Sequence, residues 1–146
     1  MTLRQAIIVD AQRLAIIHRS AIKIAMPQLP DLHTPAEDLG FYQNVVLREY
    51  DVWVVEDSDE IAGFIALQPG WVDHLYVATD HQGKGIGSRL INHAKEAQDN
   101  LRLYTFQANT PARRFYDAHG FDIIEMTDGA DNEESEPDVL YEWTKG

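Results

Sequence analysis

The 146-residue chain contains no cysteine. This absence excludes a disulfide framework, a cysteine-rich zinc site, an iron–sulfur cluster and a catalytic thiol. Any covalent intermediate would therefore need a nucleophile of another kind. We expect no bound metal.

Long apolar runs are also missing. No stretch approaches the roughly 20 residues that a membrane-spanning helix needs, and the start, Met1 to Ala6, lacks the apolar segment of a signal peptide. We therefore expect a soluble cytoplasmic protein with no membrane partner. An apolar content of 45% in 146 residues is typical of one ordinary domain.

Basic residues are scarce, with 12 Lys and Arg against 24 Asp and Glu and a formal net charge of −12. Phosphate-backbone binding needs the opposite sign, so no nucleic-acid partner is expected. The charge is unevenly distributed. Residues 84–114 hold six basic and two acidic residues, whereas residues 121–138 hold eight acidic and no basic ones. The first segment suggests an anionic ligand nearby, and the second suggests either a cationic ligand or a solvated hairpin tip.

Apolar periodicity predicts strands alternating with helices. Spacings of three and four residues predict helices that begin after Asp10, at Pro35 within a Thr34–Glu37 capping box, at Ile86 with the spacing continuing to Leu101, and after a Thr110 cap. Runs of β-forming residues predict seven strands, at residues 3–9, 52–56, 61–67, 71–78, 101–106, 121–126 and 139–144.

A glycine-rich turn lies between a predicted strand and a predicted helix, in the stretch Asp80-His81-Gln82-Gly83-Lys84-Gly85-Ile86-Gly87-Ser88. Small residues let backbone N–H groups converge on an anion there, and the helix N-terminus adds partial positive charge. The alternating glycines do not match the dinucleotide-binding or P-loop spacing. The turn is therefore a candidate phosphate site of another type, or simply a tight turn.

The residues around this turn resemble a known family. Gln82 to Gly87 is similar to the Gln/Arg-x-x-Gly-x-Gly/Ala signature of GNAT-type N-acetyltransferases. Asn109-x-x-Ala112-x-x-Phe115-Tyr116-x-x-x-Gly120-Phe121 resembles the second motif of the family. The resemblance implies one α/β (α+β) domain over residues 1–146. Its mixed, mostly antiparallel sheet of six to seven strands would be flanked by about four helices and splayed between the fourth and fifth strands.

The resemblance also implies that acetyl-CoA is a co-substrate and that it lies in the splayed opening. Lys84 and Arg89 are candidate outer charges for its phosphates. Asn109 is expected to bond the pantetheine or nucleotide end, or else to serve as a turn residue. The expected cofactor-binding residues are Leu75, Val77, Gln82, Gly83, Lys84, Gly85, Ile86, Gly87, Ser88 and Asn109.

Acyl transfer to an amine requires a proton acceptor, because an alkyl amine is only about one part in a thousand neutral at pH 7. Asp73 is the first candidate, since strand alternation puts it on one face with Trp71, Leu75 and Val77. His74 points the other way and is the second candidate, although a lone histidine in a strand is often structural.

Two further requirements concern the acyl group. A bulged strand near Leu75 to Val77 is the expected source of a backbone N–H for the developing oxyanion. Tyr116 occupies the position of the general acid in the family and would protonate the leaving thiolate; alternatively, its ring only packs the helix. Without cysteine, direct transfer in a ternary complex is the simpler prediction.

The acceptor is expected to be a small amine, and the acidic segment 125–138 favours a cationic one. Phe41, Tyr42 and Trp71 could form apolar or cation–π walls for it, or belong to the core. A protein or peptide amine is the alternative acceptor, and a non-catalytic acyl-CoA-binding module is the alternative function. A homodimer is possible.

Overall fold

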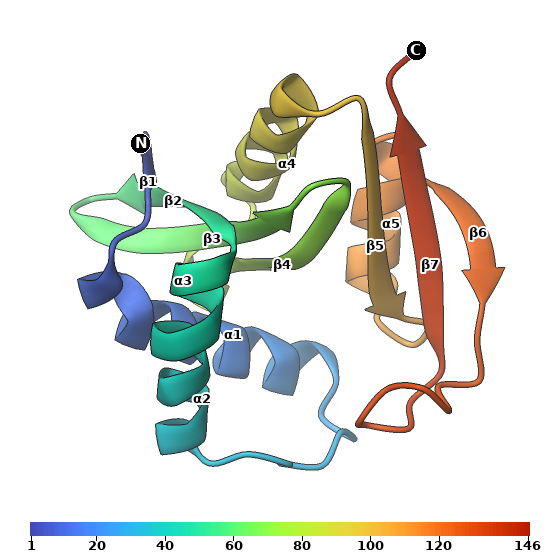
Figure 1. The fold of residues 1–146 in the computed structure, drawn as a ribbon, viewed down its shortest axis with the longest axis horizontal. Coiled ribbons are helices and arrows are strands. Elements are labelled where there is room, and N and C mark those ends of the chain that lie inside the picture. The colour runs from blue at the N-terminus through green and yellow to red at the C-terminus, as the bar shows by residue number, and fades with distance from the viewer.

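A mixed seven-stranded sheet in the order β1-β2-β3-β4-β5-β7-β6 runs through the computed structural model, which describes residues 1–146 (Figure 1). Neighbouring strands are antiparallel, except that β4 and β5 are parallel. The strands are β1 (Thr2–Gln5), β2 (Asp51–Asp57), β3 (Glu60–Gln68), β4 (Trp71–Val77), β5 (Asn100–Phe106), β6 (Asp122–Met126) and β7 (Asp138–Thr144).

Four main helices flank the sheet, in agreement with the expected fold class. A π-helical turn and the short α3 extend α2 without a break. None of the helices combines the length and apolar character needed to cross a membrane. The helices are α1 (Ala11–Ala25), α2 (Pro35–Phe41), the π-helical turn (Tyr42–Val46), α3 (Leu47–Glu49), α4 (Ile86–Ala97) and α5 (Thr110–Ala118).

The capping box predicted for α2 is present. Glu37 N–H donates to Thr34 Oγ1 at 3.1 Å, and Thr34 N–H donates to the Glu37 carboxylate at 2.8 Å. Pro35 occupies the first turn, where its missing N–H has no intrahelical acceptor to lose. Local sequence therefore determines where α2 begins.

The predictions for the first strand and for the Asp10 cap were wrong in part. The strand ends at Gln5, and residues Ile8–Asp10 form a 3-10 turn. Asp10 does precede α1, but its carboxylate turns back and accepts hydrogen bonds from Ile7 N–H at 2.8 Å and from Arg4 at 2.9 Å. A partly buried ion pair, which composition alone does not reveal, replaces the cap.

Two other boundaries also differ from the predictions. The cap of α5 is Asn109 rather than Thr110, because the Asn109 side-chain oxygen accepts from Ala112 N–H at 3.3 Å. α4 ends at Ala97, and Leu101 lies in β5 although its spacing continued the helical pattern. A single apolar residue at the end of a run, such as Leu101, fits both the helical and the strand spacing, so the pattern does not decide which element it belongs to.

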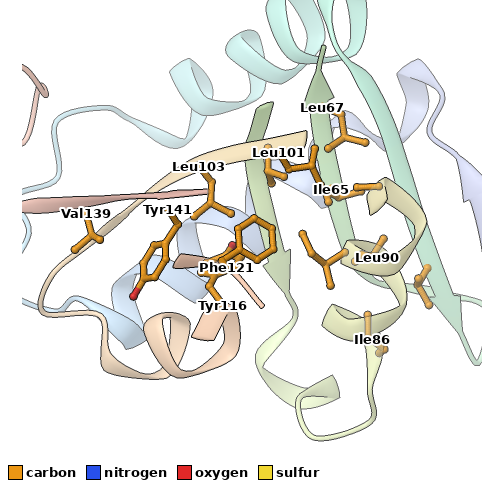
Figure 2. Close-up of a cluster of buried hydrophobic side chains, with 14 of the residues drawn as sticks. Ile65, Leu67, Ile86, Leu90, Leu101, Leu103, Tyr116, Phe121, Val139 and Tyr141 are labelled. Carbon is orange, nitrogen blue, oxygen red and sulfur yellow. The ribbon is translucent and has the colours of Figure 1, made fainter. Parts of the chain in front are cut away.

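Two hydrophobic cores lie on opposite faces of the sheet. Figure 2 shows the larger core, where Ile86 and Leu90 of α4 pack against Ile65 of β3, with Phe121 and Tyr116 nearby. The smaller core packs α1 and the π-helical turn against β2 and β3, through residues such as Leu14, Val46 and Phe64. Helices therefore cover both faces of β3, and β3 is buried along nearly its whole length.

The sheet is splayed between β4 and β5. The two parallel strands pair only at Trp71 and Arg102, and Arg102 N–H bonds Gly70 O at 2.8 Å. Beyond this contact the strands run in clearly different directions (Figure 1). The expected opening between the fourth and fifth strands is therefore present, and it positions the site described next.

Candidate active site

A cavity of about 440 Å³ lies at the opening between β4 and β5. It also reaches the N-terminal ends of α4 and α5 and the last turns of α1. All of the predicted site residues line this cavity except Lys84. The predicted residues that line it are Asp73, His74, Leu75, Val77, Gln82, Gly83, Gly85, Ile86, Gly87, Ser88, Asn109 and Tyr116.

The first turn of α4 presents free backbone amides at this cavity. Arg89 N–H makes the first helical hydrogen bond, to Gly85 O at 3.1 Å. The N–H groups of Ile86, Gly87 and Ser88 therefore have no acceptor within the helix. Gly85 caps the helix with φ of +78°, a left-handed conformation that glycine adopts without strain. The arrangement can bind an anion such as a phosphate.

Gly87 is where α4 approaches α5. A Cβ atom at this position would lie 3.0 Å from the Phe115 ring, so a larger residue would push the two helices apart. Ser88 is fixed in the same region. His119 Nδ1–H donates to Phe115 O at 2.7 Å, and His119 Nε2 lies 2.9 Å from the Ser88 hydroxyl. The Ser88 side chain is thus held within the chain.

The charged side chains expected to assist anion binding have other partners. Lys84 does not line the cavity, and its ammonium group pairs with Asp57 of β2 at 3.1 Å. Arg89 donates to the Met1 carbonyl oxygen at 3.3 Å. In this arrangement anion binding at the turn depends on backbone amides and the helix terminus.

The amides of Leu75 and Val77 point into the opening. Ala78 N–H bonds Ala62 O of β3 at 2.7 Å, and antiparallel pairing alternates from residue to residue. The polar backbone groups of Leu75 and Val77 therefore face away from β3, toward the diverging β5. They are available to a ligand that enters between the strands.

β4 carries a bulge, but at Asp73 rather than at Leu75 to Val77. The pairing of β3 with β4 passes from Leu67–Val72 to Ala66–His74, so Asp73 is the extra residue. The bulge shifts the alternation of side chains between the two faces of β4. As a result Val72, rather than Asp73, lies in the larger core with Leu75. The predicted face of Asp73 was therefore wrong, because alternation fails across a bulge.

Tyr116 is 7% exposed and packs beside Phe121 and Tyr141, with ring centroids 5.5 and 5.9 Å away. Its hydroxyl makes no hydrogen bond within the chain. Every fully buried side-chain polar atom has a partner, so the Tyr116 hydroxyl is not fully buried. It is exposed to the cavity that Tyr116 lines. Burial raises the pKa of Tyr116, with a smaller contribution from Tyr76. The phenol stays protonated at neutral pH and can donate a hydrogen bond or a proton.

His74 belongs to a cluster of rings on the α1 side of β4. Its ring lies 5.3 Å from that of His18 and 6.2 Å from that of Tyr76, and His18 stacks on Tyr76 at 4.3 Å. Burial lowers the pKa of His74 to about 3, with a further contribution from His18, and burial lowers the pKa of His18 to about 4. Both imidazoles are neutral at pH 7 and bind protons weakly.

Residues missed in the sequence analysis complete this cluster. His18 Nδ1 lies 2.7 Å from the hydroxyl of Tyr42, and burial raises the pKa of Tyr76. His18 follows the buried Leu14 by four residues, and Tyr76 follows His74 by two. Helical and strand spacing could therefore have placed both residues on these faces.

A second cavity, of about 620 Å³, lies between α1, α2, β4, β5 and the loop between β6 and β7. Phe41 and Tyr42 line it, and Tyr42 also belongs to the smaller core. Trp71 lines neither cavity and instead stacks on Tyr104 at 5.9 Å. Of the three aromatic residues predicted as possible walls of the acceptor site, Phe41 and Tyr42 therefore line this cavity and Trp71 does not.

The second cavity is strongly acidic. Its only Lys or Arg is Arg19, which pairs with Asp38 at 2.7 Å. Glu134 carries no ion pair, and its charge contributes, after burial, to the raised pKa of Tyr76. The carboxylate residues that line the cavity are Asp31, Glu37, Asp38, Asp73, Glu133, Glu134 and Asp138.

The two cavities meet at the opening in the sheet. Asp73 accepts a hydrogen bond from Gln68 at 2.8 Å and lies at this junction. An anionic ligand on the amides of α4 and a cationic ligand in the acidic cavity could therefore contact each other between β4 and β5. The residues common to both cavities are Ile22, Asp73, His74, Tyr76, Tyr104, Thr105 and Phe106.

Comparison with known proteins places this geometry in a family. Residues 48–123 match the family model described as an acetyltransferase (GNAT) domain. The peptidyl-lysine N-acetyltransferase YjaB of Salmonella typhimurium is 37% identical over 78 residues, which are 53% of this chain and 54% of that protein. The chain spans about half the length of the curated relatives that it matches.

Solved structures are similar over nearly the whole chain. The apo form of YjaB from Escherichia coli has a TM-score of 0.82 at 22% identity and covers 99% of this chain and 98% of that one. The structure of yncA from Salmonella typhimurium, solved with acetyl-CoA, has a TM-score of 0.71 at 19% identity and covers 100% and 94%. At these identities the likeness concerns the fold.

The two neutral histidines predict loss of stability in acid. Between pH 6.5 and about 4 the unfolded chain binds more protons than the folded one, because the pKa values of His18 and His74 are lowered on folding. The free energy of unfolding should therefore decrease as the pH is lowered, by about 1 to 2 kcal/mol per histidine between pH 7 and pH 5. Urea unfolding of wild type and His74→Gln at pH 7 and pH 5 measures this difference.

His74→Gln should reduce the loss of stability between pH 7 and pH 5. His33→Gln is a control of opposite sign, because Glu133 raises the pKa of the exposed His33 and that stabilisation is lost as pH rises. An unchanged pH dependence in His74→Gln would show that His74 is not held neutral by the fold.

Proposed function

Because the chain belongs to the GNAT acetyltransferase family, we propose that it transfers the acetyl group of acetyl-CoA to the primary amine of a small cationic molecule. The observation that carries this proposal is the meeting of two cavities of different character at the β4–β5 opening. One offers backbone amides for phosphates, and the other offers carboxylates for a cation. Such a pair suits direct transfer in a ternary complex, which needs no cysteine nucleophile.

The cofactor cavity fits a pyrophosphate bound to a pantetheine arm. The free amides of Ile86, Gly87 and Ser88, with the turn that precedes them, would hold the phosphates. The backbone of Leu75 and Val77 would bond the arm between the strands, and Asn109 would do so from the start of α5. Acetyl-CoA supplies an activated acyl thioester.

Tyr116 is the proposed acid. Its hydroxyl opens onto the cofactor cavity, has no competing partner in the chain and is protonated at neutral pH because burial raises its pKa. It would hold a proton for the leaving sulfur. Tyr76, whose pKa burial also raises, lines both cavities and would orient the acceptor rather than accept its proton.

Asp73 is the proposed route for the proton of the incoming ammonium group. It lies at the junction of the two cavities as a carboxylate bonded to Gln68. His74 suits this role less well, because a pKa of about 3 makes its imidazole a weak proton acceptor. We assign His74 to the wall of the acceptor cavity, where it is neutral.

A peptide lysine is the second candidate acceptor. The YjaB relative carries the name of a peptidyl-lysine acetyltransferase, and a lysine side chain presents the same primary amine as a small molecule does. A non-catalytic acyl-CoA-binding module is the remaining alternative, and it predicts binding without turnover. In this proposal the protein acts in the cytoplasm, which suits a chain without cysteine.

Tyr116→Phe tests catalysis. The variant keeps the ring that packs on Phe121 and removes only the hydroxyl, so acetyl-CoA affinity should change little while kcat falls by roughly 10²-fold or more. Release of free CoA thiol with an amine acceptor measures kcat, and calorimetry measures affinity. An unchanged kcat would remove Tyr116 from the mechanism, and binding without turnover in wild type would favour the binding module.

Gly85→Ala tests the anion site, with Gly70→Ala as a matched control. Both glycines have φ near +79° and open space around a new Cβ, so each variant should lose about 1 kcal/mol of stability from backbone strain. Only Gly85 lies at the cavity. Gly85→Ala should weaken CoA binding severalfold, whereas Gly70→Ala should not. Equal affinities in calorimetry would contradict a pyrophosphate site at this turn.

Glu134→Gln tests acceptor charge. Loss of this carboxylate should raise KM for 1,4-diaminobutane about fivefold to tenfold, because roughly 1 kcal/mol of attraction to the second ammonium is lost. KM for butylamine, which lacks that charge, should change little. Glu125→Gln, an exposed site in β6 outside the cavity, is the control. A lysine peptide that is acetylated far better than either amine would favour the peptide acceptor.

A further inference from the structure

A buried histidine separates two carboxylates where the glycine turn meets the β2–β3 hairpin. His81 ends the 3-10 turn η3 (Thr79–His81), just before Gln82, and is 7% exposed. Its Nδ1 lies 3.2 Å from Asp57 Oδ2, and its Nε2 lies 3.5 Å from Glu60 Oε2. The imidazole therefore has a carboxylate on each side.

The two ring nitrogens are not equivalent. Nδ1 lies 3.2 Å from Asp57 Oδ2 and 3.5 Å from the Lys84 ammonium, whereas Nε2 makes no hydrogen bond. If Asp57 accepts the Nδ1 proton, the lone pair of Nε2 faces Glu60. A carboxylate that orients an imidazole in this way is a common partner of metal-binding histidines, because it fixes the tautomer and increases ligand basicity.

Two exposed carboxylates, of Glu60 and Asp80, lie beside the His81 ring. Glu60 and Asp80 each place an oxygen so that these oxygens and an imidazole nitrogen all lie within 4.8 Å of one another. Arg13 pairs with Glu60 Oε1 at 2.6 Å, which leaves Oε2 free toward the histidine. Because both carboxylates are exposed, their side chains can close around a small ion.

We propose that Glu60, Asp80 and His81 bind a divalent cation of the zinc type. One nitrogen and two carboxylate oxygens suit Zn²⁺, which takes such ligands at about 2.0 to 2.2 Å and leaves a fourth position for water. Mg²⁺ and Ca²⁺ prefer all-oxygen ligands and fit less well. His81 also lines the edge of the first cavity, beside Gln82, but the proposal does not rest on the proposed function.

The local charge supports a cation. Asp57, Glu60 and Asp80 lie together, with only Arg13 and Lys84 paired to them. A bound ion would also join β3 to the start of the glycine turn, two segments about 20 residues apart in the chain. Since the ion binds the folded chain alone, it would stabilise the protein.

Calorimetry and thermal unfolding with zinc chloride alone, on tag-free protein, test the site. One Zn²⁺ should bind per chain and raise Tm, and excess Mg²⁺ should not compete. Glu60→Gln and Asp80→Asn should each weaken binding at least tenfold, because each removes a ligand. Asp57→Asn should weaken it about 10-fold to 100-fold through the orientation of His81. Glu60 and Asp80 are exposed and Asp57 is partly buried, and none of these variants replaces His81 itself.

Asp59→Asn is the matched control, because Asp59 lies in the same hairpin turn and is not among the three ligands. It should bind Zn²⁺ as wild type does. The ¹⁵N resonance of His81 Nε2 should shift on binding while Nδ1 stays protonated. Absence of binding, binding that persists in both ligand variants, or an imidazole protonated at both nitrogens and unaffected by Zn²⁺ would overturn the proposal.

Discussion

The parting of β4 from β5 is the constraint on which the site depends. Two parallel strands that paired along their whole length would satisfy each other's backbone groups and close the sheet. Here they pair at Trp71 and Arg102 and then diverge, so the polar groups of Leu75 and Val77 are left for a ligand. Both cavities open at this divergence, and the proposed acyl transfer follows from it.

Helix packing holds the parted strands in place. α4 packs closely on β3 and β4. A Cβ atom added at Gly63 of β3 would lie only 2.9 Å from Ile86 Cγ2 of α4. α5 covers β5 and β7 through Tyr116, whose ring contacts Phe121 and Tyr141. The same residues that fill the core therefore place the amides of α4 and the Tyr116 hydroxyl at the opening. Stability and site geometry are coupled for this reason.

Sequence patterns predicted most of the elements, because capping and periodicity act over a few residues. The Thr34 box and the glycine turn are local signals, and both are present. The predictions failed where side-chain pairing or strand pairing decides. Asp10 turns to Arg4 and Ile7 rather than to its own helix, and a bulge at Asp73 changes which side of β4 that residue faces. Capping and periodicity rules include neither effect.

The sequence by itself determined the class of fold, the candidate anion turn and the likeness to a family, since these depend on residue types at short spacings. Only the tertiary structure decided which charges remain free: Lys84 is paired with Asp57, whereas Glu134 lines the second cavity with Tyr76. It also brought His18 to His74 and His81 to Glu60. Burial and through-space charge set the behaviour of these groups, and both depend on segments that are far apart in the chain.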